Sequence, residues 1–330
     1  MLTHLPAALL ATALAGAFFA TPAQAQVNRT FVSAAGSDSN NCANVTTPCR
    51  HFAAAYAVTA PSGEIFVLDP ANYGSLTITH AVSIEGHGWA SIAPPNNGNA
   101  ITINAGPGDS ISIHGVSIDG TGATGGTNGI VFNSGGSLTV TDCVAQNFVN
   151  IGTQTTGNGI LLEPASGTVS FVFTNTIVSN NGFIGIYYLP PSGSTATANG
   201  VIDHVVATNN AYGIAMDTAI GSSGSATLAI SNSTASNNVY SLGSAGLFIK
   251  NASGPLAVSI DNCNISGNYN GITTLGSPKV LLGRSVITNN SNNSISNASS
   301  TFFTYQNNQI NLNGNSNTVG GTALVSLTFQ

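Results

Sequence analysis

Two carboxylates and a lysine occur at the same distance from a repeated Gly-Ile or Gly-Leu phrase. Glu163, Asp217 and Lys250 each stand three residues after the Ile or Leu of that phrase. Carboxyl groups can donate or accept protons when a sugar chain is cleaved, and a neighbouring lysine lowers the pKa of a carboxylate. If the three side chains share one surface, Glu163 suits a general acid, Asp217 a general base and Lys250 the cation beside it.

Two aromatic residues, Tyr187 and Phe248, each stand one residue after the same Ile or Leu. Aromatic faces stack on sugar rings, and carboxylates accept hydrogen bonds from sugar hydroxyls. An outer sheet surface that carries both kinds of residue predicts a polysaccharide-binding groove. The alternative interpretation is structural: Asp217 and Lys250 form a surface ion pair, and insertions at residues 190–200 and 239–245 cover the two rings.

Internal repeats explain why these positions coincide. The Gly-Ile or Gly-Leu phrase recurs at intervals of 25 to 33 residues, beginning at Gly129, Gly159, Gly185, Gly213, Gly246 and Gly271. A second phrase, typified by VVATNN and STASNN, recurs half a repeat away. Short stretches of alternating apolar and polar residues predict β-strands, and no run is long enough for a crossover helix. The chain is therefore predicted to form a parallel solenoid whose coils stack about 4.8 Å apart.

The paired asparagines and the glycines are expected at the corners of this solenoid. Both residue types tolerate positive φ, and stacked asparagine amides can hydrogen-bond from coil to coil. The Ile of each Gly-Ile phrase is expected to fill the interior, so residues at odd steps after it point outward. One outer column then holds Val131, Leu161, Tyr187, Ala215, Phe248 and Thr273, and the next holds Asn133, Glu163, Leu189, Asp217, Lys250 and Leu275.

The NNxYGI phrases resemble the repeats of right-handed parallel β-helix proteins of the pectate-lyase-like superfamily, over about residues 50–325. The resemblance implies an all-β fold, a right-handed parallel β-helix (solenoid) with a short N-terminal capping helix, of a secreted bacterial type. The group includes lyases, hydrolases, adhesins and proteins without known chemistry, so no single activity is implied. Polygalacturonases of this fold carry a Gly-His-Gly phrase, found here at Gly86-His87-Gly88, but their other catalytic segments are missing.

Three segments are predicted along the chain. Residues 1–25 form an apolar leader that ends in Ala-Gln-Ala, which is typical of a signal peptide rather than of a retained membrane helix. Residues 26–62 form an N-terminal cap, and residues 63–330 form the β-helix with its C-terminal cap. Candidates for that C-terminal cap are Phe302, Phe303 and Tyr305.

The N-terminal cap is expected to hold the helix and a disulfide. Thr47 and Pro48 suit the first positions of a helix, with Phe52, Ala55, Tyr56 and Thr59 on one face. Cys42 and Cys49 are close in sequence and are expected to pair. Cys143 and Cys263 share a column but lie four coils, or roughly 19 Å, apart, which is too far for a bond, so both are predicted to be free and buried.

A pair of acidic residues suggests a cation site. The stretches HAVSIEGHG and HGVSIDGTG align Glu85 with Asp119. Like charges on neighbouring strands repel, so either the carboxylates point into water, or one of them binds a proton, or a Ca²⁺ ion lies between them. Solvated carboxylates are the simpler interpretation, Ca²⁺ is the alternative, and no other cofactor is indicated.

The composition and the missing motifs argue against several classes of function. Only 5% of residues are charged and there are five Lys plus Arg, which argues against nucleic-acid binding. No stretch of the mature chain is apolar enough to span a membrane, and no nucleophile elbow or phosphate loop occurs. We expect a secreted protein, extracellular or periplasmic, and a non-catalytic solenoid that contacts polysaccharide or a cell surface. The alternative is a polysaccharide lyase or glycoside hydrolase with an atypical site on the outer sheet face.

Overall fold

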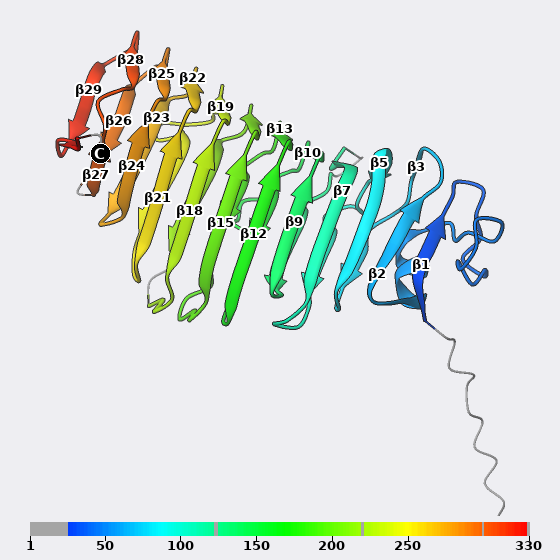
Figure 1. The fold of residues 1–330 in the computed structure, drawn as a ribbon. Helices are drawn as coiled ribbons and strands as arrows, with labels where there is room; N and C mark the ends of the chain where they lie inside the picture. Colours follow the sequence, from blue (N-terminus) through cyan, green and yellow to red (C-terminus); the bar gives the residue numbers. More distant parts are fainter. Residues whose placement is uncertain (1–25, 122–124, 219–220, 299, 329–330) are drawn as a thin grey trace, which may run out of the picture.

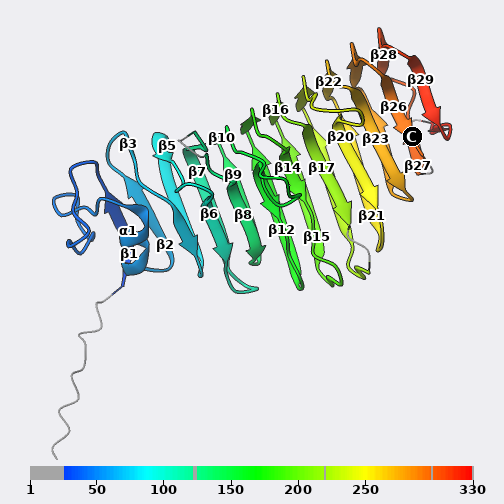
Figure 2. The same cartoon turned by 180° about the vertical axis from the view of Figure 1, so that it is seen from behind.

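The computed structural model describes residues 26–121, 125–218, 221–298 and 300–328, which form a right-handed parallel β-helix (Figures 1 and 2). The expected signal peptide, residues 1–25, lies outside the described residues. A typical coil contains three strands, and each strand pairs in parallel with the equivalent strand of the next coil. The side chains of the three columns of strands therefore meet in one continuous interior.

The first strand of a coil is longer than the second. These strands form the long-strand sheet: β1 (Val27–Val32), β2 (Thr59–Val67), β5 (Val82–Ile92), β7 (Ser110–Asp119), β9 (Ser137–Thr141), β12 (Thr168–Thr174), β15 (Thr197–Asp203), β18 (Ala226–Ser231), β21 (Leu256–Asp261), β24 (Lys279–Gly283), β27 (Thr301–Thr304) and β30 (Val325–Ser326).

The second strand of a coil is short. These strands form the short-strand sheet: β3 (Ala71–Asn72), β10 (Val144–Gln146), β13 (Ile177–Ser179), β16 (Val206–Thr208), β19 (Thr234–Ser236), β22 (Asn264–Ser266), β25 (Val286–Thr288) and β28 (Gln309–Asn311). Strands β5 and β7 continue around the corner between the two sheets, so the hydrogen bonds of both sheets are continuous.

The third strands begin near the Gly-Ile phrases and form a separate ten-stranded sheet, the Gly-Ile sheet. Its members are β4 (Leu76–Ile78), β6 (Asn99–Asn104), β8 (Asn128–Ser134), β11 (Asn158–Leu162), β14 (Ile184–Tyr188), β17 (Tyr212–Thr218), β20 (Ala245–Asn251), β23 (Asn270–Gly276), β26 (Asn293–Asn297) and β29 (Ser316–Gly321). The predicted register is confirmed, because Ala215 pairs with Phe248 and Asp217 pairs with Lys250.

The two asparagines of each pair have different roles at the corner between the short strand and the Gly-Ile strand. The first adopts positive φ, as at Asn180 (56°) and Asn237 (54°). The second is buried, and its amide donates to the amide oxygen of the same residue in the next coil. This ladder confirms the expected stacking, and its successive members are Asn181, Asn210, Asn238, Asn268, Asn290 and Asn313.

The glycine of the Gly-Ile phrase serves close approach rather than positive φ. None of the six glycines has φ in the left-handed region. A Cβ atom on Gly213 would lie 2.5 Å from the carbonyl oxygen of Gly246 and 2.9 Å from Nδ2 of Asn238 in the ladder. The asparagine ladder therefore requires glycine at this position. A side chain at the start of the Gly-Ile strand would collide with the ladder amide of the neighbouring coil.

The N-terminal end of the solenoid is covered by α1 (Phe52–Val58), which packs against β1, β2 and β4 (Figure 2). The expected disulfide between Cys42 and Cys49 is present, with Cα atoms 5.0 Å apart. The helix begins after His51, so the prediction of Thr47 as its N-cap is wrong. Thr47 lies in the loop closed by the disulfide, where its hydroxyl donates to Oδ1 of Asn41. Within the described residues, no helix is long and apolar enough to cross a lipid bilayer.

The C-terminal prediction also needs correction. Phe302 pairs with Val280 and is fully buried, so it belongs to an ordinary coil, and β28, β29 and β30 follow it. The two remaining cysteines agree with the prediction, since Cys143 and Cys263 are free and buried. Each donates its backbone N–H to a hydroxyl of the next coil, which places both at the same corner of different coils.

Candidate functional site

The first outer column of the Gly-Ile sheet points away from the interior but is covered by other side chains. Tyr187 is only 2% exposed. Its ring contacts Phe183, which contacts Tyr212, which in turn contacts Phe248, with ring centroids 6.0, 6.0 and 5.4 Å apart. Phe183 and Tyr212 stand between the paired asparagines and the Gly-Ile phrase. Sequence reasoning missed their role, although the aromatic residue in NNAYGI was the available signal.

This cover corrects the expectation for Tyr187. Its ring already packs against protein atoms on the outer side, so it offers no free face for a sugar. Phe248 and Tyr212 are only partly buried, and Phe248 therefore remains a candidate contact for a ligand. The sequence had suggested covering insertions at residues 190–200 and 239–245, whereas two aromatic residues of the asparagine corner belong to the cover.

Asp217 and Lys250 lie on neighbouring strands and form an ion pair, with Nζ of Lys250 3.0 Å from Oδ2 of Asp217. The Asp217 residue is 6% exposed, whereas the lysine side chain is 38% exposed. The second carboxylate oxygen of Asp217, Oδ1, is buried without a hydrogen-bond partner. The hydroxyl of Thr273, in the outer column with Phe248, is also buried and unpartnered. Because buried polar atoms are nearly always paired, each of these two atoms lacks an expected partner.

The electrostatics of the cluster differ from the expected acid and base pair. Burial raises the pKa of Asp217, and the hydrogen bond and charge of Lys250 offset this only in part, so the pKa stays above its usual value. Burial also raises the pKa of Glu163. The expectation that Lys250 would leave Asp217 with a lowered pKa is therefore wrong. Burial raises the pKa of the Tyr187 phenol, and the nearby carboxylates of Asp217 and Glu163 raise it further.

Glu163 continues the outer column that contains Asp217 but does not touch it. The backbone N–H of Glu163 donates to the carbonyl of Phe132, and that of Leu189 donates to the carbonyl of Leu162. These bonds place Glu163 and Leu189 in the same outer column, on neighbouring coils. Glu163 and Asp217 thus stand two coils apart with Leu189 between them, or roughly 9.6 Å between Cα atoms at about 4.8 Å per coil. The structure brings Asp217 and Lys250 into contact and leaves Glu163 as a half-buried neighbour of the same surface.

The proposed alignment of Glu85 with Asp119 is wrong. Glu85 pairs with His114, whose Nδ1 lies 2.7 Å from Oε1 of Glu85 and whose Nε2 lies 3.0 Å from Oδ2 of Asp142. Asp119 lies beyond the next corner and accepts hydrogen bonds from Thr121, Gln146 and Asn147.

The error arose because nearly identical stretches, VSIE and VSID, occupy opposite sides of a corner. The two carboxylates that were to share a Ca²⁺ ion are therefore not neighbours. In the described part of the chain, no group of three or more His, Cys, Asp or Glu is arranged to hold a metal ion.

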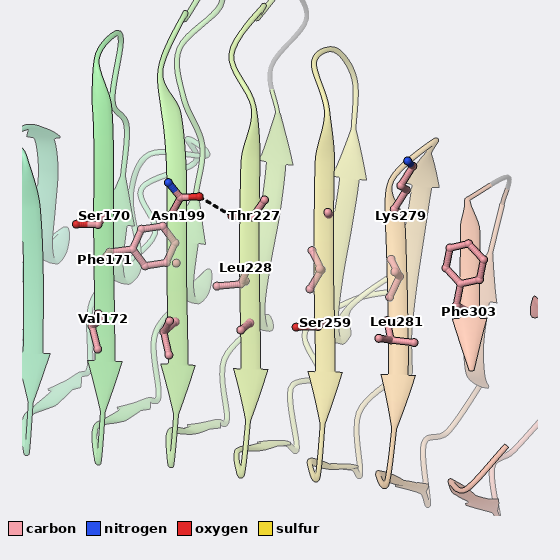
Figure 3. Close-up of a pocket in the computed structure, with 16 residues that line it drawn as sticks. Ser170, Phe171, Val172, Asn199, Thr227, Leu228, Ser259, Lys279, Leu281 and Phe303 are labelled. Carbon is pink, nitrogen blue, oxygen red and sulfur yellow. Dashed lines mark hydrogen bonds between the residues drawn. The ribbon is translucent and has the colours of Figure 1, made fainter. Parts of the chain in front are cut away.

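A second feature lies on the outer face of the long-strand sheet and was not anticipated. An open groove of about 560 Å³ crosses strands β12, β15, β18, β21, β24 and β27 (Figure 3). Its apolar column contains Val172, Val201, Ala229, Leu281 and Phe303, with Ser259 between Ala229 and Leu281. Beside it runs a polar column with Ser170, Asn199, Thr227 and Lys279.

Two solved structures are similar to this chain. One is the pectate lyase Pel9A, 16% identical, covering 92% of this chain and 78% of that chain, with a TM-score of 0.49. The other is the A-module of the Azotobacter vinelandii mannuronan C-5 epimerase AlgE6, 14% identical, covering 81% and 87%, with a TM-score of 0.40. No family model matches the chain, and no curated protein does. Likeness at this level carries no argument about activity, so function is inferred from the geometry of the two outer faces.

Proposed function

We propose that the protein is a secreted, non-catalytic solenoid that binds carbohydrate at the Asp217–Lys250 pair, on the outer face of the Gly-Ile sheet. The observation that supports this most directly is the buried, unpartnered Oδ1 of Asp217. An unsatisfied buried acceptor costs about 1–3 kcal/mol, and more when it is charged. A sugar hydroxyl that donates to this oxygen would remove the cost, so the bound state gains a charge-assisted hydrogen bond.

The surroundings fit a sugar hydroxyl better than a cation. Lys250 already neutralises the carboxylate, and its half-exposed ammonium has further N–H groups that can donate to sugar oxygens. Phe248 precedes Lys250 by two residues on the same outer face, and its partly exposed ring contacts that of Tyr212, so the two rings offer apolar area for the C–H face of a sugar. A polysaccharide or a glycan on a cell surface supplies both features.

Binding is favoured over catalysis because burial moves the pKa values of the two carboxyl groups in the same direction. A general acid and a general base at one site require environments that move their pKa values apart. Here burial raises the pKa of both Glu163 and Asp217. The only cation paired with either group among the described residues, Lys250, leaves the pKa of Asp217 still raised.

The second candidate is a glycoside hydrolase or polysaccharide lyase at the same place. The observation in its favour is that Glu163 and Asp217 both lie close enough to affect the phenol of Tyr187. A raised pKa suits Glu163 as a general acid, and a spacing of two coils approaches the separation of about 6.5–9.5 Å between carboxyl groups of inverting enzymes. In this arrangement Asp217 would act as the base, with Lys250 holding it ionised.

Export is part of the proposal. The apolar leader ending in Ala-Gln-Ala supports it, and so does the Cys42–Cys49 disulfide, because disulfides persist mainly in oxidising compartments. If export is correct, N-terminal sequencing of the protein recovered from the medium or periplasm should begin near Gln26. An intact N-terminus in exported material would contradict the predicted cleavage.

The proposal is tested by measuring binding and cleavage on a panel of plant and bacterial polysaccharides. Affinity electrophoresis reports binding, and assays for reducing and unsaturated ends report cleavage. Asp217→Asn and Lys250→Met should each weaken binding by about tenfold or more, as expected for a buried polar contact. Arg29→Met, which removes a cation from another ion pair on a different sheet and outside the groove, is the control and should have little effect.

Three outcomes separate the candidates. Loss of binding in Asp217→Asn without cleavage by wild type supports the binding module. Cleavage that is abolished by Glu163→Gln and by Asp217→Asn supports the enzyme. Unchanged binding in both Asp217→Asn and Lys250→Met, with thermal unfolding like wild type, excludes this face as the site.

A further inference from the structure

One column of outward side chains on the long-strand sheet changes in size along the solenoid. Its successive members, on β15, β18, β21, β24, β27 and β30, are Val201, Ala229, Ser259, Leu281, Phe303 and Val325. Two small residues therefore precede two large ones, and a valine stands at each end. Val201 is 41% exposed and Val325 is 46% exposed. A contiguous apolar column at the surface is typical of a contact with another protein molecule.

We propose that two copies of this chain pair face to face over the column, as a reversible dimer. The contact is on a different sheet from Asp217 and Lys250 and does not depend on the function proposed for them. The two-fold axis runs parallel to the strands and passes between β21 and β24. Rotation about this axis keeps the strand direction and reverses the order of the coils. Each member of the column then faces a different member on the partner: Val201 faces Val325, Ala229 faces Phe303, and Ser259 faces Leu281.

The shape of the column supports this axis. Ala229 and Ser259 line the middle of the groove, and Leu281 and Phe303 stand at one end of it (Figure 3). The ring of Phe303 from one copy enters the partner's groove over Ala229, and Leu281 packs over Ser259. An axis parallel to the solenoid would instead set Ala229 and Ser259 against themselves and leave a void. Protein interfaces pack as densely as interiors, so the first arrangement is favoured.

The charges at the end of the same strands are complementary about this axis. Arg284 follows β24, and its Nε lies 2.9 Å from Oδ1 of Asp261, the last residue of β21. The arginine side chain is 67% exposed and the aspartate side chain 40%. Because β21 of one copy faces β24 of the other, each Asp261 lies opposite the partner's Arg284, and four charges alternate in sign. Lys279, at the start of β24, faces the partner's Ala257 at the solvent-exposed rim.

The size of the contact predicts a reversible dimer. Six strands with about five residues each cover about 450 Å² per copy, at about 4.8 Å per strand and 3.3 Å per residue. The total of about 900 Å² is below the roughly 1,200 Å² at which stable interfaces begin. Association should therefore depend on protein concentration. Salt should weaken it, because the alternating charges are partly exposed.

The first test measures the dissociation constant of the full mature chain by sedimentation equilibrium over a concentration series. Ala229→Arg places a long charged side chain where the partner's Phe303 enters, and Phe303→Ala removes that ring. Ser112→Arg is the matched control, because Ser112 points outward in the same column but lies outside the contact. Ala229→Arg should raise the dissociation constant about tenfold or more and Phe303→Ala by a smaller factor, whereas Ser112→Arg leaves it unchanged. Thermal unfolding checks that the two arginine variants are folded.

The second test determines the axis by cross-linking Val201→Cys and Val325→Cys, two variants that carry tags of different size. In one chain these positions are five coils, or about 24 Å, apart, whereas facing sheets are separated by about 10 Å. A bis-maleimide about 10 Å long should therefore link the two variants to each other and neither variant to itself. Cys143 and Cys263 are buried and should not react.

Each measurement has an outcome that contradicts the proposal. Wild type that remains monomeric at every concentration, or equal effects of Ala229→Arg and Ser112→Arg, would overturn the dimer. Val201→Cys that links to itself would place the axis along the solenoid and overturn the arrangement. Linking of Val201→Cys to Val325→Cys, lost when Ala229→Arg is added to both chains, would establish it.

Discussion

The outer faces of the Gly-Ile sheet and of the long-strand sheet follow the same rule of alternation but differ in what covers them. On the Gly-Ile sheet, the outward side chain of Tyr187 is 2% exposed and Asp217 is buried beside Lys250. On the long-strand sheet, the outward side chain of Val201 is 41% exposed. The period of the strands therefore decides which way a side chain points, and the corners decide whether it reaches solvent.

The two kinds of corner differ in the side chains that they contribute. The long strands end in a turn made by one residue at positive φ, such as Asn175, and the short strand resumes two residues later. The Gly-Ile strands are preceded by corners that contribute Phe183 and Tyr212, and these side chains cover the sheet. A buried polar pair and an open groove can thus occur on one solenoid.

The largest expected effect tests whether the cover of the Gly-Ile sheet contributes a second core. Tyr187→Ala removes a large, nearly fully buried ring and should lower the free energy of unfolding by about 3–4 kcal/mol. Val201→Ala on the open face should lower it by about 0.5 kcal/mol. Urea unfolding followed by circular dichroism measures both. Similar losses in the two variants would contradict the comparison.

The next effect concerns the asparagine corner that carries the covering side chains. Asn238 accepts from the N–H and amide of Asn210 and donates to Asn268 and to the carbonyl of Ala207. Asn238→Ala leaves several of these buried groups unpaired, and we expect a loss of about 2–3 kcal/mol. Asn237→Ala, at φ of 54°, loses conformational tolerance and should cost about 1 kcal/mol.

Asn237→Gly is the control that separates the two roles, because glycine keeps the positive φ without a side chain. Its unfolding free energy should stay within about 0.5 kcal/mol of wild type. A large loss in Asn237→Gly would show that the first asparagine also depends on its amide.

Much of this architecture could be predicted because it depends on one quantity, the position of each residue within the repeat. Aligning the Gly-Ile phrases is enough to pair Ala215 with Phe248 and Asp217 with Lys250, and to separate Cys143 from Cys263. The alignment of Glu85 with Asp119 failed because the two similar stretches lie on opposite sides of a corner. The sequence pattern does not show on which side of the corner each stretch lies.

The solvent exposure of the candidate site could not be predicted in the same way. Whether Tyr187 is free depends on where Phe183 folds, and the pKa of Asp217 depends on how much water that cover removes. The groove was missed because no chemistry-bearing motif marks it. It consists of small residues such as Ala229 at outward positions, and their effect appears only when neighbouring coils are stacked.

A smaller effect tests the burial of the ion pair. Lys250→Met leaves the buried carboxylate of Asp217 without its cation, so we expect a loss of about 1–2 kcal/mol at pH 8, less than for a fully buried pair because the lysine is half exposed. The folded pKa of Asp217 is already raised from 3.8 and should rise further in the variant. Protonated Asp217 favours folding below pH 3.8, and that contribution disappears as the pH rises through the folded pKa.

The difference between wild type and Lys250→Met should therefore be small near pH 4 and largest at pH 8, as measured by urea unfolding across that range. Lys279→Met provides the control on the open face, because Lys279 has no acidic partner among the described residues. A pH-independent difference for Lys250→Met would show that packing of the lysine stem, rather than charge, stabilises the pair.

The smallest expected effect concerns His114, which joins neighbouring coils at the corner between the long-strand and short-strand sheets. Burial lowers the pKa of His114, but hydrogen bonds to Glu85 and Asp142 outweigh it, so the pKa is raised above 6.5. Both ring nitrogens face carboxylates, so the arrangement fits the protonated imidazolium. His87 also approaches Glu85, at 3.4 Å, and shares the same carboxylate.

Because the folded pKa is raised, the stabilisation is fully present below pH 6.5 and disappears as the pH rises through the folded value. His114→Gln should lower the unfolding free energy by less than about 1 kcal/mol at pH 6, since the imidazole and the two carboxylates are partly exposed, and by almost nothing at pH 9. His204→Gln is the matched control, since the ion pair of His204 is with its neighbour Asp203 in the same coil. If the two variants lost stability equally at pH 6, contacts between coils through His114 would add nothing, and the corner would be held by the backbone ladder alone.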